Sequence, residues 1–379
     1  MDFQETPIQA ELRELARRFA QKELAPIVEE DEKTETFRPE IIKKLGEIGL
    51  TGVPVPEAYG GAGMGYQEYA IVIEELARVS TSYAISVAVT GLPQMILAAS
   101  GSEAQKQKYI PPLSSGNAIG AFGLSEPSSG SDAGSLRTTA RLDGDHYVIN
   151  GTKLWITQGD VADTIILMAR TGGPGPKGVS SFIIEKGMKG FSLGKREKKM
   201  GCHISHTMEL IFQDCRVPVA NRIGNEGDGF KVAMSALNGG RITIASAANG
   251  IAAASLEVAA NHASMREQFG KPIGELQGVS FMLADMAVAL DSSKLLVQRA
   301  AWLKDNGMSF ATEASMAKLF ATDSAMKITT DAVQVLGGSG YTQEFPVERY
   351  MREAKVLQIV EGTNQVQRMI IGRALTAKK

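Results

Sequence analysis

The chain has little cysteine and no block of basic charge. Its 379 residues include two cysteines, Cys202 and Cys215, which form no CxxC motif and are too few for a disulfide framework. This usage is typical of a reducing compartment, and each thiol is predicted to be a small buried apolar residue. The formal net charge is −2, and no run of Lys and Arg stands out, which argues against a protein that binds nucleic acid or a membrane surface.

The sequence also lacks an obvious membrane span or signal segment. Its longest stretch without a charged side chain, 79–102, carries several hydroxyls together with Pro93 and Gln94, which favours buried helices over a membrane span. Met1–Glu5 is acidic and polar, unlike a secretory signal. With 44% hydrophobic and 22% charged residues, the composition is that of a soluble globular protein, and we expect a cytoplasmic location.

Several familiar catalytic motifs are missing. The glycine-rich segment 60–65 follows no strand and lacks the GxGxxG spacing, so it predicts a loop between helices rather than a phosphate loop. Neither Ser125 nor any other serine lies in a GxSxG motif, which argues against a serine hydrolase. There is no HExxH motif, and His203 and His206 precede a predicted strand, so no metal is expected.

Apolar periodicity divides the chain into three regions. Residues 1–118 carry helical stripes such as Ile8-Leu12-Leu15-Phe19, and Ser102 with Gln105 predicts a capping box for a short helix that ends before Pro111-Pro112. Residues 226–379 are rich in Ala and Met at helical spacing, which predicts a bundle of long helices. The pattern predicts an α+β multidomain protein with helical regions on either side of a β region, 119–225.

The middle region shows strand and turn signals. Residues 146–149 and 152–157 flank Asn150-Gly151, which predicts a hairpin with a type I′ turn. Residues 164–170 and 179–185 flank a Gly/Pro-rich tip and predict a second hairpin, and 207–216 predicts a further strand. We therefore expect a small antiparallel β domain that closes near Pro218.

One strand is predicted to present an aromatic ring beside a hydroxyl. Alternation places Leu154 and Ile156 on one face, and Trp155 and Thr157 on the other. An indole next to a hydrogen-bonding hydroxyl suits a flat heteroaromatic ligand. A plain pair of surface residues is the alternative interpretation.

Two other segments offer contacts to an anion. The loop 123–132 is dense in glycine and hydroxyls, which can donate hydrogen bonds to a phosphate or a carbonyl, although a flexible loop has the same composition. Residues 266–271 place Arg266 and Lys271 around a helix end, where cations are favoured by the helix dipole and could also clamp an anion.

A single carboxylate near the end of the chain is the candidate proton acceptor. Glu361 follows two aliphatic residues and precedes Gly362 and Thr363, and an apolar site raises the pKa of a carboxyl group into the range useful for proton transfer. The alternative interpretation is a helix start, with Glu361 in the first turn and a helix over 366–375. The two interpretations are compatible.

Together these motifs resemble those of the acyl-CoA dehydrogenase family, and the resemblance covers essentially the full length. The matching segments, in the family's order, are 123–132, 155–157, 266–270, 334–338 and 361–363. The resemblance implies an N-terminal helical domain, a middle antiparallel β domain and a C-terminal four-helix domain, usually as a homotetramer (dimer of dimers). It also implies FAD bound without a Rossmann fold, in agreement with the missing GxGxxG motif.

The resemblance implies α,β-dehydrogenation of an acyl-CoA substrate, with Glu361 as the catalytic base and an electron-transfer flavoprotein as the acceptor. Overall similarity favours short or short branched acyl chains. Substrate contacts are implied for Ser131, Asn238, Arg241 and Gly362. FAD contacts are implied for Phe122, Leu124, Ser125, Gly130, Ser131, Trp155, Ile156, Thr157, Arg266, Gln268, Phe269, Gln277, Gln334, Val335, Gly337, Gly338, Thr363, Asn364 and Gln365.

Within that set, relatives use the positions of Arg266, Gln277 and 334–338 to grip the FAD of a neighbouring subunit. Two positions depart from the family's pattern. Asn238 stands where many relatives have Asp, which weakens a charged contact at the substrate mouth. Gly240 stands where one branch of the family carries its base, which leaves Glu361 as the candidate.

An oxygen-using acyl-CoA oxidase and a catalytically silent acyl-CoA or flavin binder are the alternative functions.

Overall fold

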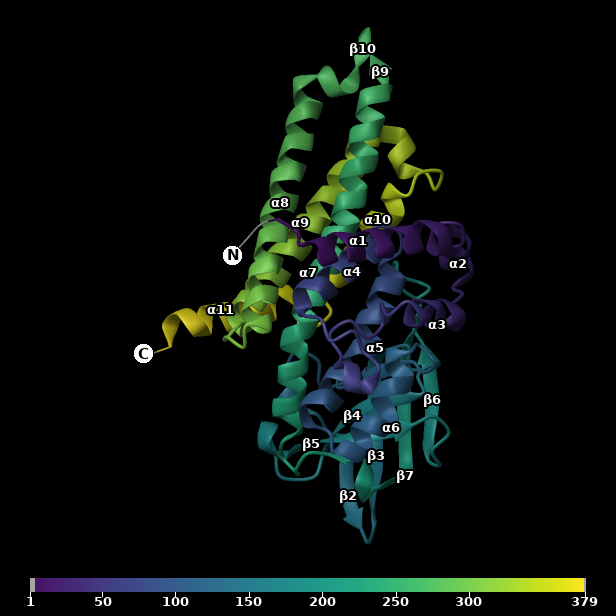
Figure 1. The fold of residues 1–379 in the computed structure, drawn as a ribbon, viewed down its shortest axis with the longest axis vertical. Coiled ribbons are helices and arrows are strands. Elements are labelled where there is room, and N and C mark those ends of the chain that lie inside the picture. Colours follow the sequence, from purple (N-terminus) through teal and green to yellow (C-terminus); the bar gives the residue numbers. More distant parts are fainter. Residues whose placement is uncertain (1–3, 378–379) are drawn as a thin grey trace.

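The computed structural model, which describes residues 4–377, shows helices, then a sheet, then helices along the chain. In Figure 1 the sheet lies at one end of the long axis, and a hairpin between two long helices lies at the other. The first helical region ends at Ser114, strands occupy the chain from Gly120 to Ile223, and the second helical region begins at Gly229. The predicted α, β, α order is confirmed.

Among the described residues, the first region contains six α-helices, and the long connection between the third and the fourth includes segment 60–65, which is a loop as predicted. Thr6 caps the first helix, and Ser102 with Gln105 forms the predicted capping box of the sixth. The helices are α1 (Pro7–Phe19, continued by a π turn over Ala20–Leu24), α2 (Val28–Thr34), α3 (Pro39–Glu47), α4 (Tyr66–Ala77), α5 (Thr81–Ser100) and α6 (Glu103–Ser114).

Helix α6 does not end before its prolines, as the sequence suggested, but runs through Pro111 and Pro112 to Ser114. The prediction was wrong because these prolines lie in the last turn. Each proline removes one backbone N–H donor from this turn, but the proline φ is already helical and only two further residues follow before the helix ends. The carbonyls of Pro111 and Pro112 still accept hydrogen bonds from the backbone N–H groups of Ser115 and Ala118.

The charge-free stretch forms one helix, α5, with Pro93 inside it. Two helices, Thr81–Ser100 and Gly229–Met265, are long and apolar enough to cross a membrane by length and composition. Most of each helix is buried inside the protein, so both are core helices, as predicted for 79–102.

The strands of the middle region form one eight-stranded sheet in the order β6-β7-β3-β2-β4-β5-β8, with β1 on β4. Most pairings are antiparallel, and the predicted β4–β5 hairpin is confirmed; β1 on β4, and a single pair between β2 and β4, are parallel. The strands are β1 (Gly120–Gly123), β2 (Thr139–Asp143), β3 (His146–Thr157), β4 (Thr164–Arg170), β5 (Val179–Glu185), β6 (Phe191–Arg196), β7 (Thr207–Pro218) and β8 (Arg222–Ile223).

The predicted hairpin at Asn150-Gly151 is wrong, because β3 runs straight through both residues with a bulge in its pairing to β7. The Asn150 side chain exchanges two hydrogen bonds with Asp214 of β7. Gly151 has φ 148°, and a Cβ there would lie 2.5 Å from the Thr138 hydroxyl. Contacts with neighbouring segments therefore hold the Asn-Gly pair in a bulge and not in a turn. The true turn into β3 is at Gly144-Asp145.

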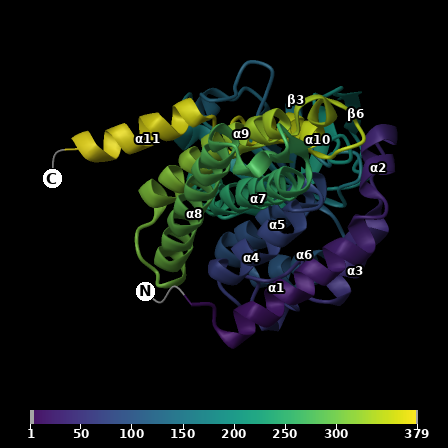
Figure 2. The same ribbon diagram turned by 90° about the horizontal axis from the view of Figure 1, so that it is seen from above.

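The C-terminal region contains α7 (Gly229–Met265), α8 (Gln277–Asp305), α9 (Ala311–Leu336), α10 (Val347–Leu357) and α11 (Asn364–Thr376). Strands β9 (Glu267–Gln268) and β10 (Lys271–Pro272) form the hairpin between α7 and α8. Seen from above, α11 extends away from the other helices (Figure 2).

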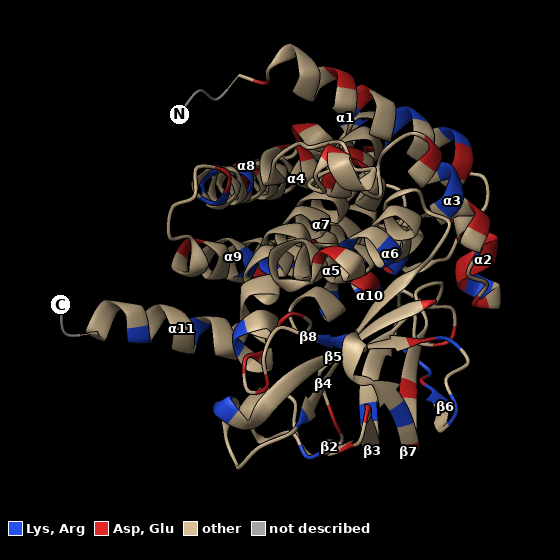
Figure 3. Ribbon diagram, turned by 60° about the horizontal axis from the view of Figure 1, so that its bottom comes forward, with Lys and Arg blue, Asp and Glu red and all other residues tan. Residues whose placement is uncertain are grey.

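Helix α7 lies at the centre of the molecule and packs against α4, α5, α8, α9 and α10. One hydrophobic cluster includes residues of α1, α4, α5, α7 and α9, so the two helical regions share a continuous core. In Figure 3, the ribbons of outer helices such as α1 and α2 carry many charged residues, and those of α5 and α7 carry few. A long stretch of α7, from Gly239 to Ser255, is buried.

Candidate active site

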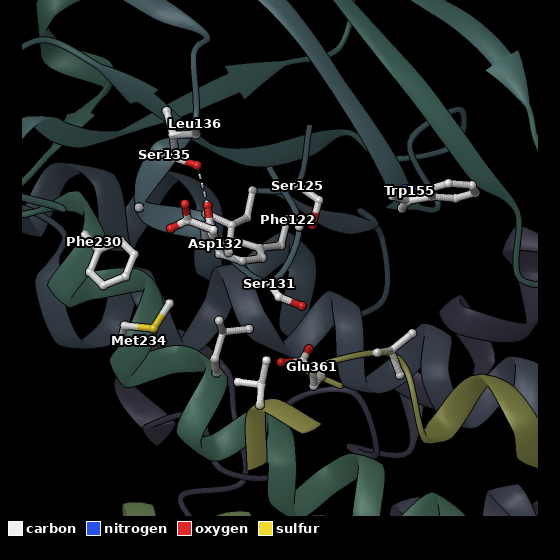
Figure 4. A pocket seen from close by; sticks show the side chains of 18 of the residues that line it. Phe122, Ser125, Ser131, Asp132, Ser135, Leu136, Trp155, Phe230, Met234 and Glu361 are labelled. Atoms are coloured by element: carbon white, nitrogen blue, oxygen red, sulfur yellow. Dashed lines mark hydrogen bonds between the residues drawn. The ribbon is translucent and has the colours of Figure 1, made fainter. Parts of the chain in front are cut away.

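A cavity of about 1120 Å³ lies where the sheet, α5, α7 and the segment before α11 meet. The loop after β1 and the end of β3 form one wall, and Phe230 and Met234 of α7 lie on the opposite side, with Glu361 below the loop (Figure 4). The cavity wall is mostly apolar with a few converging polar groups, which is typical of a small-molecule site.

Glu361 lies in a short segment of left-handed backbone. Its φ is 55° and that of Gly362 is 88°, and the helix α11 begins two residues later with Thr363 as its N-cap. The prediction of a helix start is confirmed, but Glu361 precedes the cap and is not in the first turn. A non-glycine residue with positive φ is uncommon and is concentrated at functional sites, where surrounding contacts hold it.

The Glu361 carboxylate faces the cavity and lacks an ion-pair partner within the described residues. Its Oε2 atom is buried without a hydrogen bond. Burial raises the pKa of Glu361 to about 7, although the positive charges of Arg241 and Lys318 oppose the shift. Such a pKa suits a group that must take up a proton near neutral pH.

Gly240 of α7 makes room for this carboxylate. A Cβ at position 240 would lie 2.7 Å from Glu361 Oε2 and 2.8 Å from its carboxyl carbon. The sequence singled out both positions, and the structure brings them face to face. A side chain at position 240 would therefore push against the carboxyl end of Glu361 and displace it.

If Glu361 is the base that the sequence predicts, Gly240→Ala should slow proton abstraction about tenfold, because the added methyl group displaces the Glu361 carboxylate and a small misplacement costs one to two orders of magnitude. Gly278→Ala is the matched control, since a Cβ at position 278 meets nothing within 4 Å. Single-turnover bleaching of the cofactor absorbance measures the rate. An unchanged rate in Gly240→Ala would show that the carboxylate position is uncritical.

Arg241 is a buried cation beside the acid. Its Nη1 donates to Asn238 Oδ1 at 2.6 Å and to Ser315 Oγ at 3.4 Å, and its Nε has no partner. Burial lowers the pKa of Arg241, and the charge of Glu361 opposes this shift. Arg241 lines the cavity, whereas Asn238 contacts Arg241 and is not part of the cavity wall.

Two buried lysines support the site, and sequence reasoning missed both. Lys153 of β3 pairs with Glu126 at 2.7 Å and donates to the Leu124 carbonyl at 3.0 Å. Glu126 also accepts the backbone N–H groups of Arg137 and Thr138, so this ion pair shapes the loop 123–132 from beneath. Burial lowers the pKa of Lys153 to about 8, and Glu126 opposes that shift.

The second buried lysine is Lys318 of α9. Its Nζ donates to the Gly362 carbonyl at 3.0 Å and to Asn364 Oδ1 at 2.8 Å. Asn364, predicted to contact a cofactor, is itself buried and donates to Thr322 and Asp323. Its side chain is therefore used to connect α11 to α9.

The end of β3 departs from simple alternation. Lys153 pairs with Leu210 and Ile156 with Met208, so β3 has one extra residue here, and Trp155 has φ 64°. The bulge leaves Ile156 buried and the Trp155 indole 58% exposed, and Trp155, Ile156 and Thr157 all line the cavity. A flat aromatic side chain and a hydroxyl are presented together, as predicted.

The structure brings together most of the predicted loop and strand residues. The residues of that set that line the cavity are Phe122, Leu124, Ser125, Gly130, Ser131, Trp155, Ile156, Thr157, Arg241, Glu361, Gly362 and Thr363. In the part of the chain that the structure describes, the hydroxyls of Ser125, Ser131 and Thr157 have no hydrogen-bond partner, and they converge on the cavity. Free donors beside an exposed indole fit a flat ligand with a polar edge and phosphates.

Other predicted cofactor residues lie outside this cavity. Phe269 is 90% exposed at the tip of the β9–β10 hairpin, with Arg266 and Gln268 beside it. Gln277 is exposed at the start of α8, and Gln365 on α11. At the end of α9, Gln334, Gly337 and Gly338 are exposed and Val335 is buried.

The two histidines considered as metal ligands lie apart from the cavity. The ring nitrogens of His203 contact the carbonyls of Glu32 and Lys199, and those of His206 contact Asp160 and the Glu35 carbonyl. Among residues 4–377, no group of three or more His, Cys, Asp or Glu side chains is arranged to hold a metal ion.

Comparison with known proteins identifies the class to which this site belongs. Models of the acyl-CoA dehydrogenase N-terminal, middle and C-terminal domains match residues 6–117, 121–215 and 227–376. The short-chain specific acyl-CoA dehydrogenase of Clostridium acetobutylicum is 48% identical over 373 residues, 98% of each chain.

Solved structures agree with this match. Butyryl-CoA dehydrogenase from Megasphaera elsdenii is 45% identical, with a TM-score of 0.98 over 100% of both chains. A structure described as the electron transferring flavoprotein of Acidaminococcus fermentans, in work on electron bifurcation, is 48% identical, with a TM-score of 0.98 over 100% of both chains.

The fold and the site together define a flavin-dependent oxidoreductase. The chain belongs to the acyl-CoA dehydrogenase family. It is an FAD enzyme that dehydrogenates acyl-CoA thioesters, and the predicted fold class, cofactor and reaction are confirmed.

Proposed function

We propose that this enzyme converts short-chain acyl-CoA thioesters to 2-enoyl-CoA, with Glu361 as the catalytic base. The observation that carries the proposal is the Glu361 carboxylate, which faces the cavity with a buried, unpartnered oxygen and a pKa raised to about 7. The preference for short chains rests on the similarity to the short-chain enzyme of Clostridium acetobutylicum and to butyryl-CoA dehydrogenase.

In this mechanism the protein binds, orients and moves a proton. Glu361 removes a proton from the α-carbon of the thioester, and bound FAD supplies the acceptor for the hydride that leaves the β-carbon. The cavity wall is mostly apolar, and burial leaves the Glu361 carboxylate weakly solvated, which strengthens it as a base. Ile85, Val89 and Ile244 line the cavity and would contact the acyl chain.

The residues that would hold FAD fall into two groups. In the first group, Ser125, Ser131 and Thr157 would bond its polar edges and Trp155 would pack on the ring. The second group, Arg266, Gln268, Phe269, Gln277 and 334–338, belongs to exposed or terminal segments outside the cavity. Their placement supports a homotetramer in which they reach the FAD of a neighbouring subunit. An electron-transfer flavoprotein would take up the electrons.

The rate of cofactor reduction by substrate should rise with pH through about 7. Only the carboxylate form of Glu361 can accept the α-proton, and burial raises the pKa of this group to about 7. Below that pH the group is protonated and the rate falls tenfold per pH unit. Anaerobic stopped-flow measurements between pH 5.5 and 8.5, roughly centred on this pKa, test the prediction. A rate that is independent of pH would contradict it.

A panel of acyl-CoA thioesters of rising length and branching, with an artificial electron acceptor, tests the proposed substrate class. We expect the highest kcat/KM with butyryl-CoA. Best activity on long chains would refute the short-chain preference. Rapid peroxide formation in air would identify an oxidase instead, and binding without reduction of FAD would identify a silent binder.

A further inference from the structure

The segment that carries Glu361 is held by a polar network in the protein interior. Two consecutive residues, Glu361 and Gly362, have positive φ, and a side chain at position 362 would place its Cβ 2.9 Å from Gln367 Nε2. The Gln367 amide donates to the carbonyls of both residues, at 3.2 and 2.8 Å. This backbone turn determines where the Glu361 carboxylate points.

Lys318 of α9 bonds to the same turn. Its Nζ donates to the Gly362 carbonyl and to the Asn364 side chain, and Lys318 is 0% exposed. Asn364 in turn donates to Thr322 and to Asp323, which also accepts from Gln358. The lysine therefore connects α9 to the backbone on the C-terminal side of the acid.

The environment of this lysine is unusual. Among the described residues no carboxylate lies within ion-pair distance of Lys318, and both of its acceptors are neutral oxygens. A buried ammonium group without a counter-ion is costly, and such groups are typically retained at functional sites. The negative charges of Glu361 and Asp323 favour its protonated form, whereas burial opposes it.

We propose that Lys318 is the positioning residue of the catalytic base. Its two hydrogen bonds fix the left-handed turn at Glu361-Gly362, so that the carboxylate stays against Gly240 at the cavity wall, and its charge stabilises the ionised acid. The inference rests on the proposed role of Glu361 as the base. Nothing in the family resemblance or the comparisons assigns a function to Lys318.

The groups that face Glu361 set the sign of the expected pH effect. They are Arg241 of α7, Lys318 of α9 and Tyr66 of α4, and Asp323 faces Lys318. Burial lowers the pKa of Lys318 to about 7, so the lysine is protonated on the acidic side of the rate profile. Removing its charge there raises the pKa of Glu361 and moves the acidic limb to higher pH.

Lys318→Met removes the amine at nearly constant length, and Lys318→Gln keeps a donor without the charge. Thr329→Val is the matched control, because Thr329 is fully buried on α9 and its hydroxyl bonds only to the Met326 carbonyl of the same helix. The readouts are FAD reduction by butyryl-CoA and α-deprotonation of 3-thiabutyryl-CoA. The latter loses its α-proton but has sulfur at the β-position, so it forms a long-wavelength charge-transfer band with oxidised flavin without turnover.

We expect Lys318→Met to reduce FAD at least tenfold more slowly than the wild-type enzyme, with the pH midpoint of the charge-transfer band higher by about one unit. Lys318→Gln should share the pH shift with a smaller loss of rate, and Thr329→Val should match the wild type in both. If Lys318→Met does not fold or loses FAD, the pH midpoint of the charge-transfer band in Lys318→Gln tests the inference instead.

Both Lys318 variants could have a lower melting temperature but a normal rate of FAD reduction and a normal pH midpoint of the charge-transfer band. That result would show that Lys318 is only structural and would overturn the inference. If the wild-type enzyme itself neither reduces FAD with butyryl-CoA nor forms the charge-transfer band, the proposed function fails and the inference with it. If the wild-type enzyme reduces FAD and forms the charge-transfer band, and both Lys318 variants match it in rate and pH midpoint, the inference fails while the proposed function stands.

Discussion

Glu361→Gln should bind FAD and acyl-CoA normally and yet lose about 10³-fold or more in the rate of FAD reduction by substrate. The amide has the size of the acid but cannot accept the α-proton, and a positioned general base contributes 10²- to 10⁴-fold, roughly, to such reactions. The loss is expected to be near-complete because position 240, which faces the Glu361 carboxyl group, is glycine and offers no substitute base.

Stopped-flow mixing with butyryl-CoA measures the rate, and the flavin spectrum reports cofactor content. Glu29→Gln is the control, because Glu29 is an exposed carboxylate of α2 outside the cavity. Ordinary reduction rates in Glu361→Gln would refute the assignment. Partial activity in Glu361→Asp would support it, because a shorter side chain keeps the chemistry but misplaces the oxygen.

Lys153→Met should lower the free energy of unfolding by about 3–5 kcal/mol, since breaking a buried ion pair leaves Glu126 as an uncompensated charge. Lys153 is 0% exposed and also donates to the Leu124 carbonyl, so the loop 123–132 loses its support at the same time. We therefore expect FAD to dissociate more readily as well as a loss of stability.

Urea unfolding of the holoenzyme measures the change in stability. The double variant Lys153→Met/Glu126→Gln should recover part of the loss, because it removes the uncompensated charge, although the single amide oxygen can replace only one of the two carboxylate oxygens that accept from Arg137 and Thr138. Lys195→Met breaks an exposed pair with Glu197 and should change stability by less than about 1 kcal/mol. Equal effects at Lys153 and Lys195 would contradict the assigned importance of the buried pair.

The sequence predicted the order of the elements because helix and strand periodicities are local properties. It failed where distant contacts override local preference. The Asn150-Gly151 pair, a strong turn signal, became a bulge because Thr138 leaves no room for a side chain at position 151 and Asp214 pairs with Asn150. The two prolines of α6 lie two and three residues before its end, so the donors that they remove affect only the last turn.

In the site, too, local patterns were predicted and distant contacts were not. Glu361, the hydroxyl-rich loop and the Trp155 strand were found from residue type and local spacing, but the supporting lysines were not. No feature of the sequence near Lys153 predicts its ion pair with Glu126, which is 27 residues away. Lys318 did leave a signal: it falls in the buried stripe of α9 formed by Ala314, Ala317, Ala321 and Ala325. A lysine in such a stripe predicts a buried amine with a partner.

The face-to-face arrangement of Gly240 and Glu361 also has a geometric consequence. Because a Cβ at position 240 would touch the carboxyl group of residue 361, an acid attached to either backbone would enter the same corner of the cavity. The cavity therefore has one corner for a base and two backbone positions from which that corner can be reached. A side chain at position 240 and the carboxylate of Glu361 would compete for the same space.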